Sequence, residues 1–254
     1  MVSDPAASLV LLHGLLGDAD DWRPVIQALP GVPCHALDLP GHGRNRALRV
    51  SGFDEAHRWL CHELAARDIA HYRLVGYSLG GRLALHHASH SPAGLQALLL
   101  ENCHPGLPAG ERPARIAHDE AWARRFECEP LTRVLADWYR QGVFADLDDD
   151  ARTRQAARRL GNDGKAVAAM LRATSLGRQP DLAPWLRDTR LPVQWISGNR
   201  DHKFHALACQ LVKQGCNIKH LALDGGHNLH TSQPDTFARL LREWAHQPEE
   251  KIHD

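Results

Sequence analysis

Short apolar runs alternate along this chain with longer amphipathic stretches, and this alternation restricts the fold more than any other feature. Six runs read as buried strands: Ser8–His13, Pro33–Leu39, Arg73–Tyr77, Leu95–Glu101, Pro192–Ser197 and Ile218–Leu223. The stretches with helical periodicity are Asp20–Ala28, Phe53–Arg67, Leu79–Ser89, Phe204–Lys213 and Pro234–Trp244. Strands that alternate with helices form a mostly parallel sheet with helices on both faces, so the sequence predicts an α/β fold.

One interval interrupts the alternation. Residues 106–186 contain no convincing strand, only helical segments separated by breakers such as Pro130, Gly142 and Pro180. A segment of this kind between two strands predicts an inserted helical lid. Residues 1–105 and 187–254 would then form the core of one domain.

Charge and composition exclude several classes of function. The 30 lysines and arginines are balanced by 30 aspartates and glutamates, whereas a protein that tracks nucleic-acid phosphates needs a basic excess. The start Met1–Pro5 lacks a signal-peptide pattern, and no apolar run is long enough to cross a bilayer. The six cysteines form no C-x-x-C pair and are interpreted as reduced thiols. We therefore expect a cytoplasmic monomer or weak homo-oligomer with no nucleic-acid or membrane partner.

The strongest chemical signal is the string Gly76-Tyr77-Ser78-Leu79-Gly80, which fits G-x-S-x-G. An apolar strand precedes it and a helix follows it, as in a nucleophile elbow. Such a sharp turn strains the serine backbone and tolerates only small neighbours, hence the flanking glycines. The turn would place the Ser78 hydroxyl beside the helix N-terminus, whose free N–H groups favour developing negative charge.

An acid and a histidine follow in the order that this arrangement uses. Asp201 comes after the strand Pro192–Ser197, and His227 comes after Ile218–Leu223. Because both strands end at the carboxyl edge of the sheet, Ser78, Asp201 and His227 are predicted to meet there as a catalytic triad. Glu101, at the end of its own strand, and Asp224 remain alternative acids.

A glycine turn near the N-terminus completes the predicted site. His13-Gly14-Leu15 follows the first strand, and the backbone N–H groups of Leu15 and Leu79 would form an oxyanion hole. The loop Asp38–Gly43 is interpreted as structural support for the same edge.

No metal or cofactor is expected. The histidines at 86, 87, 90 and 104 lack a suitable carboxylate or cysteine arrangement in the sequence, and helical spacing is expected to scatter them. A G-x-G-x-x-G nucleotide loop and a Walker sequence are both absent.

Taken together, these pieces resemble the α/β-hydrolase superfamily over nearly the whole chain. The resemblance is especially close to the 2-succinyl-6-hydroxy-2,4-cyclohexadiene-1-carboxylate synthase family of menaquinone biosynthesis. The strings that carry it are Gly76–Arg82, His104–Leu107, Glu129–Thr132, Ala136–Tyr139, Ala168–Leu171 and Arg200–Phe204. The strings in residues 106–186 best distinguish this family from other members of the superfamily, because lids vary with function while the sheet does not.

The resemblance implies a lyase that eliminates pyruvate from a small polycarboxylate, with Ser78 as a base rather than a nucleophile. It also implies that Arg82, Arg115 and Arg159 bind the substrate carboxylates, with Trp138 and Tyr139 nearby. From the residues alone, only Arg82 stands out, because it lies one turn into the helix after Ser78.

Most of these side chains could also have purely structural or surface roles. The two lid arginines are not distinguishable from other lid arginines, for which a solvated surface role is the commoner one, and the two aromatic residues could equally pack the lid. Lys203 is either a cation beside the site or a surface lysine. The excess of arginine over lysine fits carboxylate recognition or a GC-rich genome equally well.

Two rival functions share these features. A carboxylesterase or thioesterase would use Ser78 to form an acyl-enzyme, and turnover of p-nitrophenyl esters would reveal it. A non-catalytic relative of the fold would bind ligands or partners only, but such relatives generally lose a member of the triad.

Overall fold

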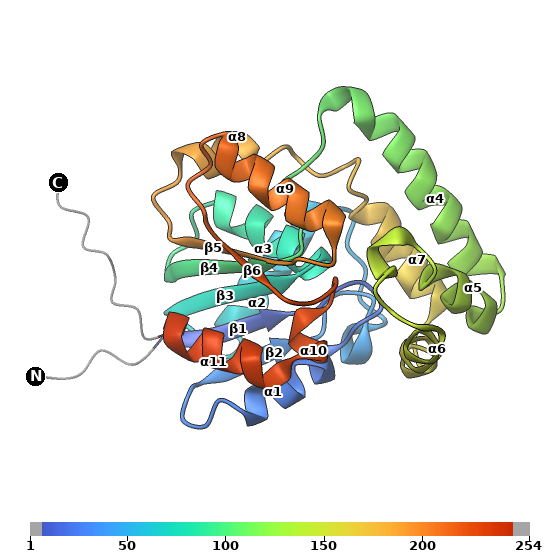
Figure 1. The fold of residues 1–254 in the computed structure, drawn as a ribbon, viewed down its shortest axis with the longest axis horizontal. Helices are drawn as coiled ribbons and strands as arrows, with labels where there is room; N and C mark the ends of the chain where they lie inside the picture. The colour runs from blue at the N-terminus through green and yellow to red at the C-terminus, as the bar shows by residue number, and fades with distance from the viewer. Residues whose placement is uncertain (1–6, 246–254) are drawn as a thin grey trace, which may run out of the picture.

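The computed structural model describes residues 7–245, which form a parallel six-stranded sheet between two layers of helices (Figure 1). The segment Met1–Pro5 lies outside the described residues. The strands are β1 Ser8–Leu12, β2 Cys34–Leu37, β3 Tyr72–Tyr77, β4 Leu95–Glu101, β5 Val193–Gly198 and β6 Lys219–Leu223. Their spatial order is β2-β1-β3-β4-β5-β6, and every neighbouring pair is parallel. The predicted α/β-hydrolase fold is confirmed.

Both faces of the central strands are buried, because these strands contribute apolar side chains alternately to two cores. The edge strand β6 is largely exposed. In β1, Val10 and Leu12 belong to one core, whereas Leu9 and Leu11 belong to the other. The first core includes side chains of α2 Phe53–Ala65, α3 Leu79–Ser89, α8 Ala183–Asp188 and α9 His202–Lys213. The second includes side chains of α1 Arg23–Gln27, α10 Leu229–Ser232 and α11 Pro234–Ala245.

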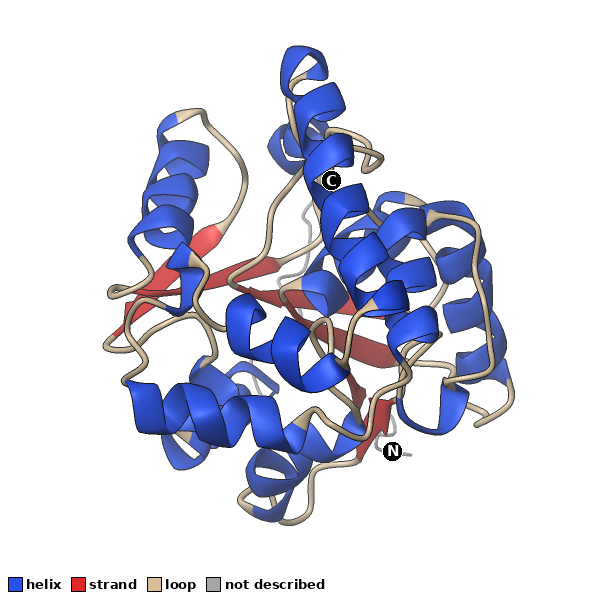
Figure 2. Cartoon of the chain, turned by 90° about the vertical axis from the view of Figure 1, so that its right-hand side faces the viewer, coloured by secondary structure: helices blue, strands red, loops and turns tan. Residues whose placement is uncertain are grey.

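Between β4 and β5 the described chain is helical. The elements are η3 Ala109–Glu111, α4 Arg112–Cys128, α5 Leu131–Trp138, η4 Gly142–Phe144, α6 Asp149–Arg158 and α7 Gly164–Ala173, before α8. They have their own apolar cluster, which includes Phe126, Val134 and Leu135 and reaches Leu16 of the core. Figure 2 shows these helices in front of the strand ends. The division at residues 106 and 186, and the role of this segment as a lid, stay predictions.

Local chemistry explains where the observed elements differ from the predicted ones. The predicted helix Asp20–Ala28 divides into η1 Ala19–Trp22 and α1, whose first turn contains Pro24. Helix α9 begins at His202, two residues earlier than predicted, because the Asp201 carboxylate caps it by accepting the Phe204 N–H at 3.3 Å. Within residues 7–245, no helix has the length and apolar character needed to cross a membrane.

Candidate active site

Ser78 occupies a strained turn between β3 and α3. Its backbone has φ 49° and ψ −108°, and its N–H donates to the Glu101 carbonyl of β4 at 2.9 Å. The flanking glycines are sterically required: a Cβ on Gly76 would lie 2.5 Å from the Gly80 carbonyl oxygen. A Cβ on Gly80 would lie 2.4 Å from the Leu12 carbonyl oxygen. The close approach of α3 to β1 and β3 therefore holds Ser78 at the carboxyl edge of the sheet.

Asp201 and His227 reach the same point from the ends of β5 and β6. The His227 Nδ1–H donates to Asp201 Oδ2 at 2.5 Å, and the Ser78 hydroxyl lies 3.3 Å from His227 Nε2. Asp201 and His227 are both buried. The structure thus brings the three predicted residues into one hydrogen-bonded chain, in which the carboxylate leaves Nε2 free to accept the serine proton.

The alternative acids lie elsewhere. The fully buried Glu101 carboxylate accepts the Leu229 N–H at 2.6 Å and the His230 Nδ1–H at 2.7 Å. Asp224 is on the surface, 3.7 Å from Arg200. Neither carboxylate is paired with the His227 ring, so Asp201 is the acid that this geometry favours.

Asn102 is a supporting residue that the sequence reasoning missed. Its Nδ2–H donates to the His227 carbonyl at 2.7 Å, and its Oδ1 accepts the Gly198 N–H at 3.2 Å. Asn102 therefore joins the end of β5 to the loop that carries the histidine. A polar residue directly after β4 was the available signal, since the neighbouring strands also end in site residues.

Two buried histidines hold the N-terminal glycine loop. His13 Nε2 accepts the Leu39 N–H at 3.0 Å, and His42 Nε2 accepts the Leu16 N–H at 3.1 Å. The Nδ1–H groups of the two rings donate to the carbonyls of Gly14 and Pro40, at 2.7 and 3.0 Å. Burial lowers the pKa of His13, and it lowers that of His42 to about 3, so both rings are neutral as these acceptor roles require.

This loop brings Leu15 to the cavity at the site. A Cβ on Gly14 would lie 2.6 Å from the Tyr77 ring, so only glycine allows the backbone to come so close. Leu15 lines the cavity, and Leu79 is the first residue of α3, where a backbone N–H has no partner within the helix. The structure therefore places Leu15 on the loop after β1 and Leu79 at the start of α3, next to Ser78.

The cavity beside His227 has a volume of about 100 Å³. Its walls come from the core loops and from the inserted helices, and they include Leu15, Tyr77, Tyr139, Phe144, Arg159 and His227. Tyr139 reaches this cavity, but its neighbour Trp138 points into the cluster of the inserted helices. The centroid of the Trp138 ring lies 5.0 Å from that of Trp122 and 5.4 Å from that of Phe126.

Arg159 lies at the cavity and is paired with Asp21. Its Nη1 and Nη2 donate to the two carboxylate oxygens at 2.9 and 2.8 Å, and both side chains are buried. Burial alone would raise the pKa of Asp21, but the guanidinium of Arg159 outweighs it and lowers that pKa. The pair joins the inserted segment to η1, the short helix that follows β1.

A second group of cations consists of Arg82, Arg115 and Lys203. Arg82 donates to the Thr174 carbonyl at 2.7 Å, and burial, followed by repulsion from Arg115, lowers its pKa to about 10. Arg115 is paired with Asp119 at 2.8 Å. Burial and the charge of Arg115 also lower the pKa of Lys203. Mutual repulsion in a partly desolvated region favours binding of an anion there.

The expectation that the histidines at 86, 87 and 90 lack a suitable carboxylate or cysteine arrangement is wrong. Packing of α2 against α3 places Asp54 with His86 and His90, and it places His57 and Cys61 with His87. These partners lie some 30 residues away in sequence, so spacing within one helix could not reveal them. His104 is separate from both groups, and its Nδ1 accepts the Gly106 N–H at 3.1 Å.

Comparison with known proteins gives one consistent result. Residues 9–240 match the family described as "Alpha/beta hydrolase family". The chain is 47% identical to the 2-succinyl-6-hydroxy-2,4-cyclohexadiene-1-carboxylate synthase of Yersinia enterocolitica over 235 residues, 92% of this chain and 84% of the relative. It is 45% identical to the synthase of the same name from Serratia proteamaculans over 242 residues, 94% of this chain and 93% of the relative.

Solved structures agree with the sequence comparison. The structure of MenH from S. aureus superimposes with a TM-score of 0.85 at 26% identity, covering 96% of this chain and 94% of that one. A carboxylesterase structure from Nitrososphaera gargenis superimposes with a TM-score of 0.77 at 20% identity, covering 94% of this chain and 90% of that one. This likeness concerns the fold alone.

Proposed function

Because the chain belongs to the α/β-hydrolase family and, within it, to the 2-succinyl-6-hydroxy-2,4-cyclohexadiene-1-carboxylate synthases, we propose that it catalyses the pyruvate elimination of menaquinone biosynthesis. The substrate is 2-succinyl-5-enolpyruvyl-6-hydroxy-3-cyclohexene-1-carboxylate, and the products are pyruvate and the 2,4-diene. The observation that carries the proposal is near 47% identity over 92% of the chain to a relative with this activity in its name. The site geometry supplies the groups that the reaction needs.

The reaction needs a base for a carbon acid. A proton leaves C2, which is activated by the adjacent succinyl carbonyl, and a C2=C3 bond forms. The ring double bond then moves to C4=C5 and the C5–O bond breaks, which releases the enolate of pyruvate. This enolate becomes pyruvate when it takes up the proton that His227 has received, which also restores the neutral imidazole. The Ser78 oxygen takes the C2 proton while its own proton passes to His227 Nε2, 3.3 Å away. Asp201 holds the Nδ1–H tautomer and stabilises the imidazolium.

The enolate charge develops on the succinyl oxygen. The N–H groups of Leu15, on the loop after β1, and of Leu79, at the start of α3, are the donors that we assign to it. Ser78 forms no acyl-enzyme in this scheme, which separates it from the esterase alternative.

The two groups of cations, one with Arg159 at the cavity and one with Arg82, suit a substrate with several carboxylates. Arg82 donates to neutral acceptors, the Thr174 carbonyl and the Gln179 amide, so its charge is available to a ligand. Arg115 and Arg159 already have carboxylate partners, so a substrate carboxylate would share or displace them. We assign Tyr139 to the cavity wall beside Arg159. Trp138 would act by packing the inserted helices unless they rearrange.

We further propose that the enzyme acts in the cytoplasm on a free polycarboxylate, as a monomer or weak homo-oligomer. It would need no cofactor, nucleic acid or membrane. The balanced charge of the chain supports the exclusion of nucleic acid. Size-exclusion chromatography with light scattering measures the oligomeric state.

The test follows pyruvate release and diene absorbance on freshly generated substrate. Wild-type protein should accelerate both in equal amounts over the spontaneous rate. Ser78→Ala should lower the rate by at least ~10³-fold, whereas Ser89→Ala on the same helix should not change it. His227→Asn should cost about as much as Ser78→Ala, and the double variant should be little worse because the two residues act as a unit. A wild-type rate equal to background, together with brisk p-nitrophenyl ester turnover, would establish the esterase instead.

A further inference from the structure

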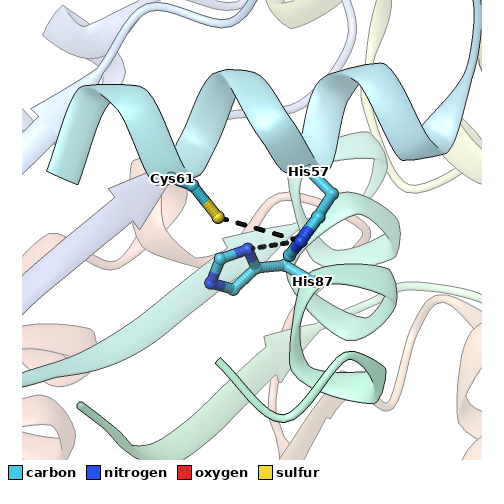
Figure 3. Close-up of side chains that lie close together, drawn as sticks. All are labelled: His57, Cys61 and His87. Atoms are coloured by element: carbon cyan, nitrogen blue, oxygen red, sulfur yellow. Dashed lines mark hydrogen bonds between the residues drawn. The ribbon is translucent and has the colours of Figure 1, made fainter. Parts of the chain in front are cut away.

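We propose that α2 and α3 form a binding site for one divalent transition-metal ion of the zinc class, held by His57, Cys61 and His87. Figure 3 shows the three side chains pointing toward one another, two from α2 and one from α3. One ligand atom from each residue lies within 4.8 Å of the others. An imidazole–imidazole–thiolate set is typical of zinc and related ions and is unsuited to calcium or magnesium.

The arrangement follows from helix geometry. His57 and Cys61 are four residues apart in α2, so they lie one above the other on the same face. Helix α3 packs against that face and supplies His87. His87 is fully buried, whereas His57 and Cys61 are partly exposed, so an ion can enter from solvent and be held at the inner end.

The ligand atoms are already close together, although the two shortest separations involve different nitrogens of the His57 ring. The Nδ1 atoms of His57 and His87 are 2.9 Å apart, and Cys61 Sγ is 3.8 Å from His57 Nε2. Zinc bonds of about 2.0 to 2.3 Å in a tetrahedron separate the ligand atoms by roughly 3.3 to 3.6 Å. One ion can bind only one nitrogen of His57, and with one atom taken from each residue the three ligand atoms lie within 4.8 Å of one another. Rotation of the His57 side chain would bring them to zinc distances, with the fourth position left for water.

A buried hydroxyl orients the inner ligand. Tyr72 Oη lies 2.6 Å from His87 Nε2, so an Nε2–H donated to this oxygen leaves the Nδ1 lone pair for the metal. Second partners of this kind fix ring orientation at metal sites. Burial lowers the pKa of His57, and it lowers that of His87 to about 3, so both imidazoles are neutral near pH 7. Binding displaces the thiol proton of Cys61 to solvent as the sulfur–metal bond forms.

The site is separate from the proposed reaction. His87 lies nine residues after Ser78, which is roughly 14 Å along the helix at 1.5 Å per residue. An ion held here would link α2 to α3 and stabilise the folded chain, because it would bind the folded state in preference to the unfolded one.

The neighbouring group Asp54, His86 and His90 offers the contrasting possibility. Asp54 is exposed and accepts the His86 Nε2–H at 2.9 Å, while His86 Nδ1 is buried with no hydrogen-bond partner. Variants of Asp54 and Cys61 therefore decide which group holds the ion.

The test uses cobalt(II) as the probe, added to full-length protein stripped with a chelator and kept reduced without added thiols. One equivalent should produce a thiolate-to-cobalt charge-transfer band and tetrahedral d–d bands, and zinc should abolish both. Cys61→Ser should remove the charge-transfer band, whereas Asp54→Asn should keep it. Tyr72→Phe should weaken affinity roughly 10-fold.

The chain contains a matched control in α9. His205 and Cys209 have the same four-residue spacing and the same 3.8 Å separation of Sγ and Nε2, but within residues 7–245 they belong to no group of three possible ligands. Cys209→Ser should therefore leave the spectrum unchanged. Zinc should raise the thermal unfolding midpoint of wild type and of Cys209→Ser, but not of Cys61→Ser, whose folding is checked by circular dichroism. A wild type without the charge-transfer band, or a band that survives in Cys61→Ser, would overturn the proposal.

Discussion

At the scale of single residues, partners from distant segments determine what each side chain at the carboxyl edge can do. The His227 ring is held by Asp201 at Nδ1, and its backbone carbonyl is held by Asn102. Arg82 lies over the Phe53 ring, 5.7 Å from its centroid, and donates to the Thr174 carbonyl. Its guanidinium therefore stays close to the sheet edge in a partly desolvated position, where a charge interacts strongly with an anion.

Arg82→Gln tests whether that charge recognises the substrate. Glutamine can still donate to the Thr174 carbonyl but loses the charge, so kcat/KM for the polycarboxylate should fall roughly 10- to 100-fold, the equivalent of one charged hydrogen bond. Turnover of a neutral ester, if measurable, should change little. Arg124→Gln, an exposed arginine of α4, is the control. Equal losses on both substrates would show that Arg82 is structural.

At the scale of elements, the site depends on how closely α3 approaches the sheet and on how the inserted helices are tied to the core. The packing of α3 against the sheet leaves no room for a side chain at Gly80, where an added Cβ would lie 2.4 Å from the backbone of β1. The connection between the inserted helices and the core includes the buried ion pair of Asp21 and Arg159, two residues that lie 138 positions apart in sequence.

Gly80→Ala should displace the start of α3 and with it Ser78. The opposing atoms are backbone, which cannot rotate away, so we expect both a loss of stability of about 1–3 kcal/mol, as for overpacking, and a loss of activity. Gly110→Ala, where nothing lies within 4 Å, is the control. Urea unfolding and the pyruvate assay measure the two effects. An unaltered rate in Gly80→Ala would mean that the turn tolerates displacement.

Asp21→Ala should leave the Arg159 charge buried without its partner. Removing one member of a buried pair costs about 3–5 kcal/mol of unfolding free energy. Asp224→Ala breaks the exposed pair with Arg200 and should cost less than about 1 kcal/mol. Chemical denaturation of both variants makes the comparison. Similar small losses of unfolding free energy in the two variants would show that the cavity around Arg159 is well hydrated in solution.

At the scale of the whole molecule, buried neutral histidines should make the fold sensitive to acid. Burial lowers the pKa of His42, His87 and His104 to about 3, from 6.5 in the unfolded chain. The unfolded chain therefore binds more protons between these values, so the stability that the neutral rings contribute is present above pH 6.5 and is lost as pH falls toward 3.

Each such histidine should add about 1.4 kcal/mol per pH unit to the slope of stability against pH below 6.5. Urea unfolding from pH 7 to pH 5 measures this slope. His42→Gln, which keeps an acceptor for the Leu16 N–H, should lower the slope by one histidine's contribution. His62→Gln on the exposed side of α2 should leave it unchanged. A slope that His42→Gln does not alter would show that this ring is protonated in the folded protein.

The sequence by itself determined the sheet, its flanking helices and the residues at the strand ends. Periods of two and of 3.6 residues are local properties, and the carboxyl ends of parallel strands meet at one edge whatever the details of packing. For this reason Ser78, Asp201 and His227 could be predicted as neighbours, with Leu15 on the loop after the first strand and Leu79 at the start of the helix after Ser78.

Only the tertiary structure decided which side chains of the helical segments meet. Arg159 reaches Asp21, Tyr139 reaches the cavity while Trp138 packs among the inserted helices, and α2 brings Cys61 to His87. Each outcome depends on the rotation and crossing of packed helices, and these are set by the sum of many weak contacts between segments distant in sequence. No local pattern records that sum, so the sequence could identify the edge at which the site lies but not every side chain that surrounds it.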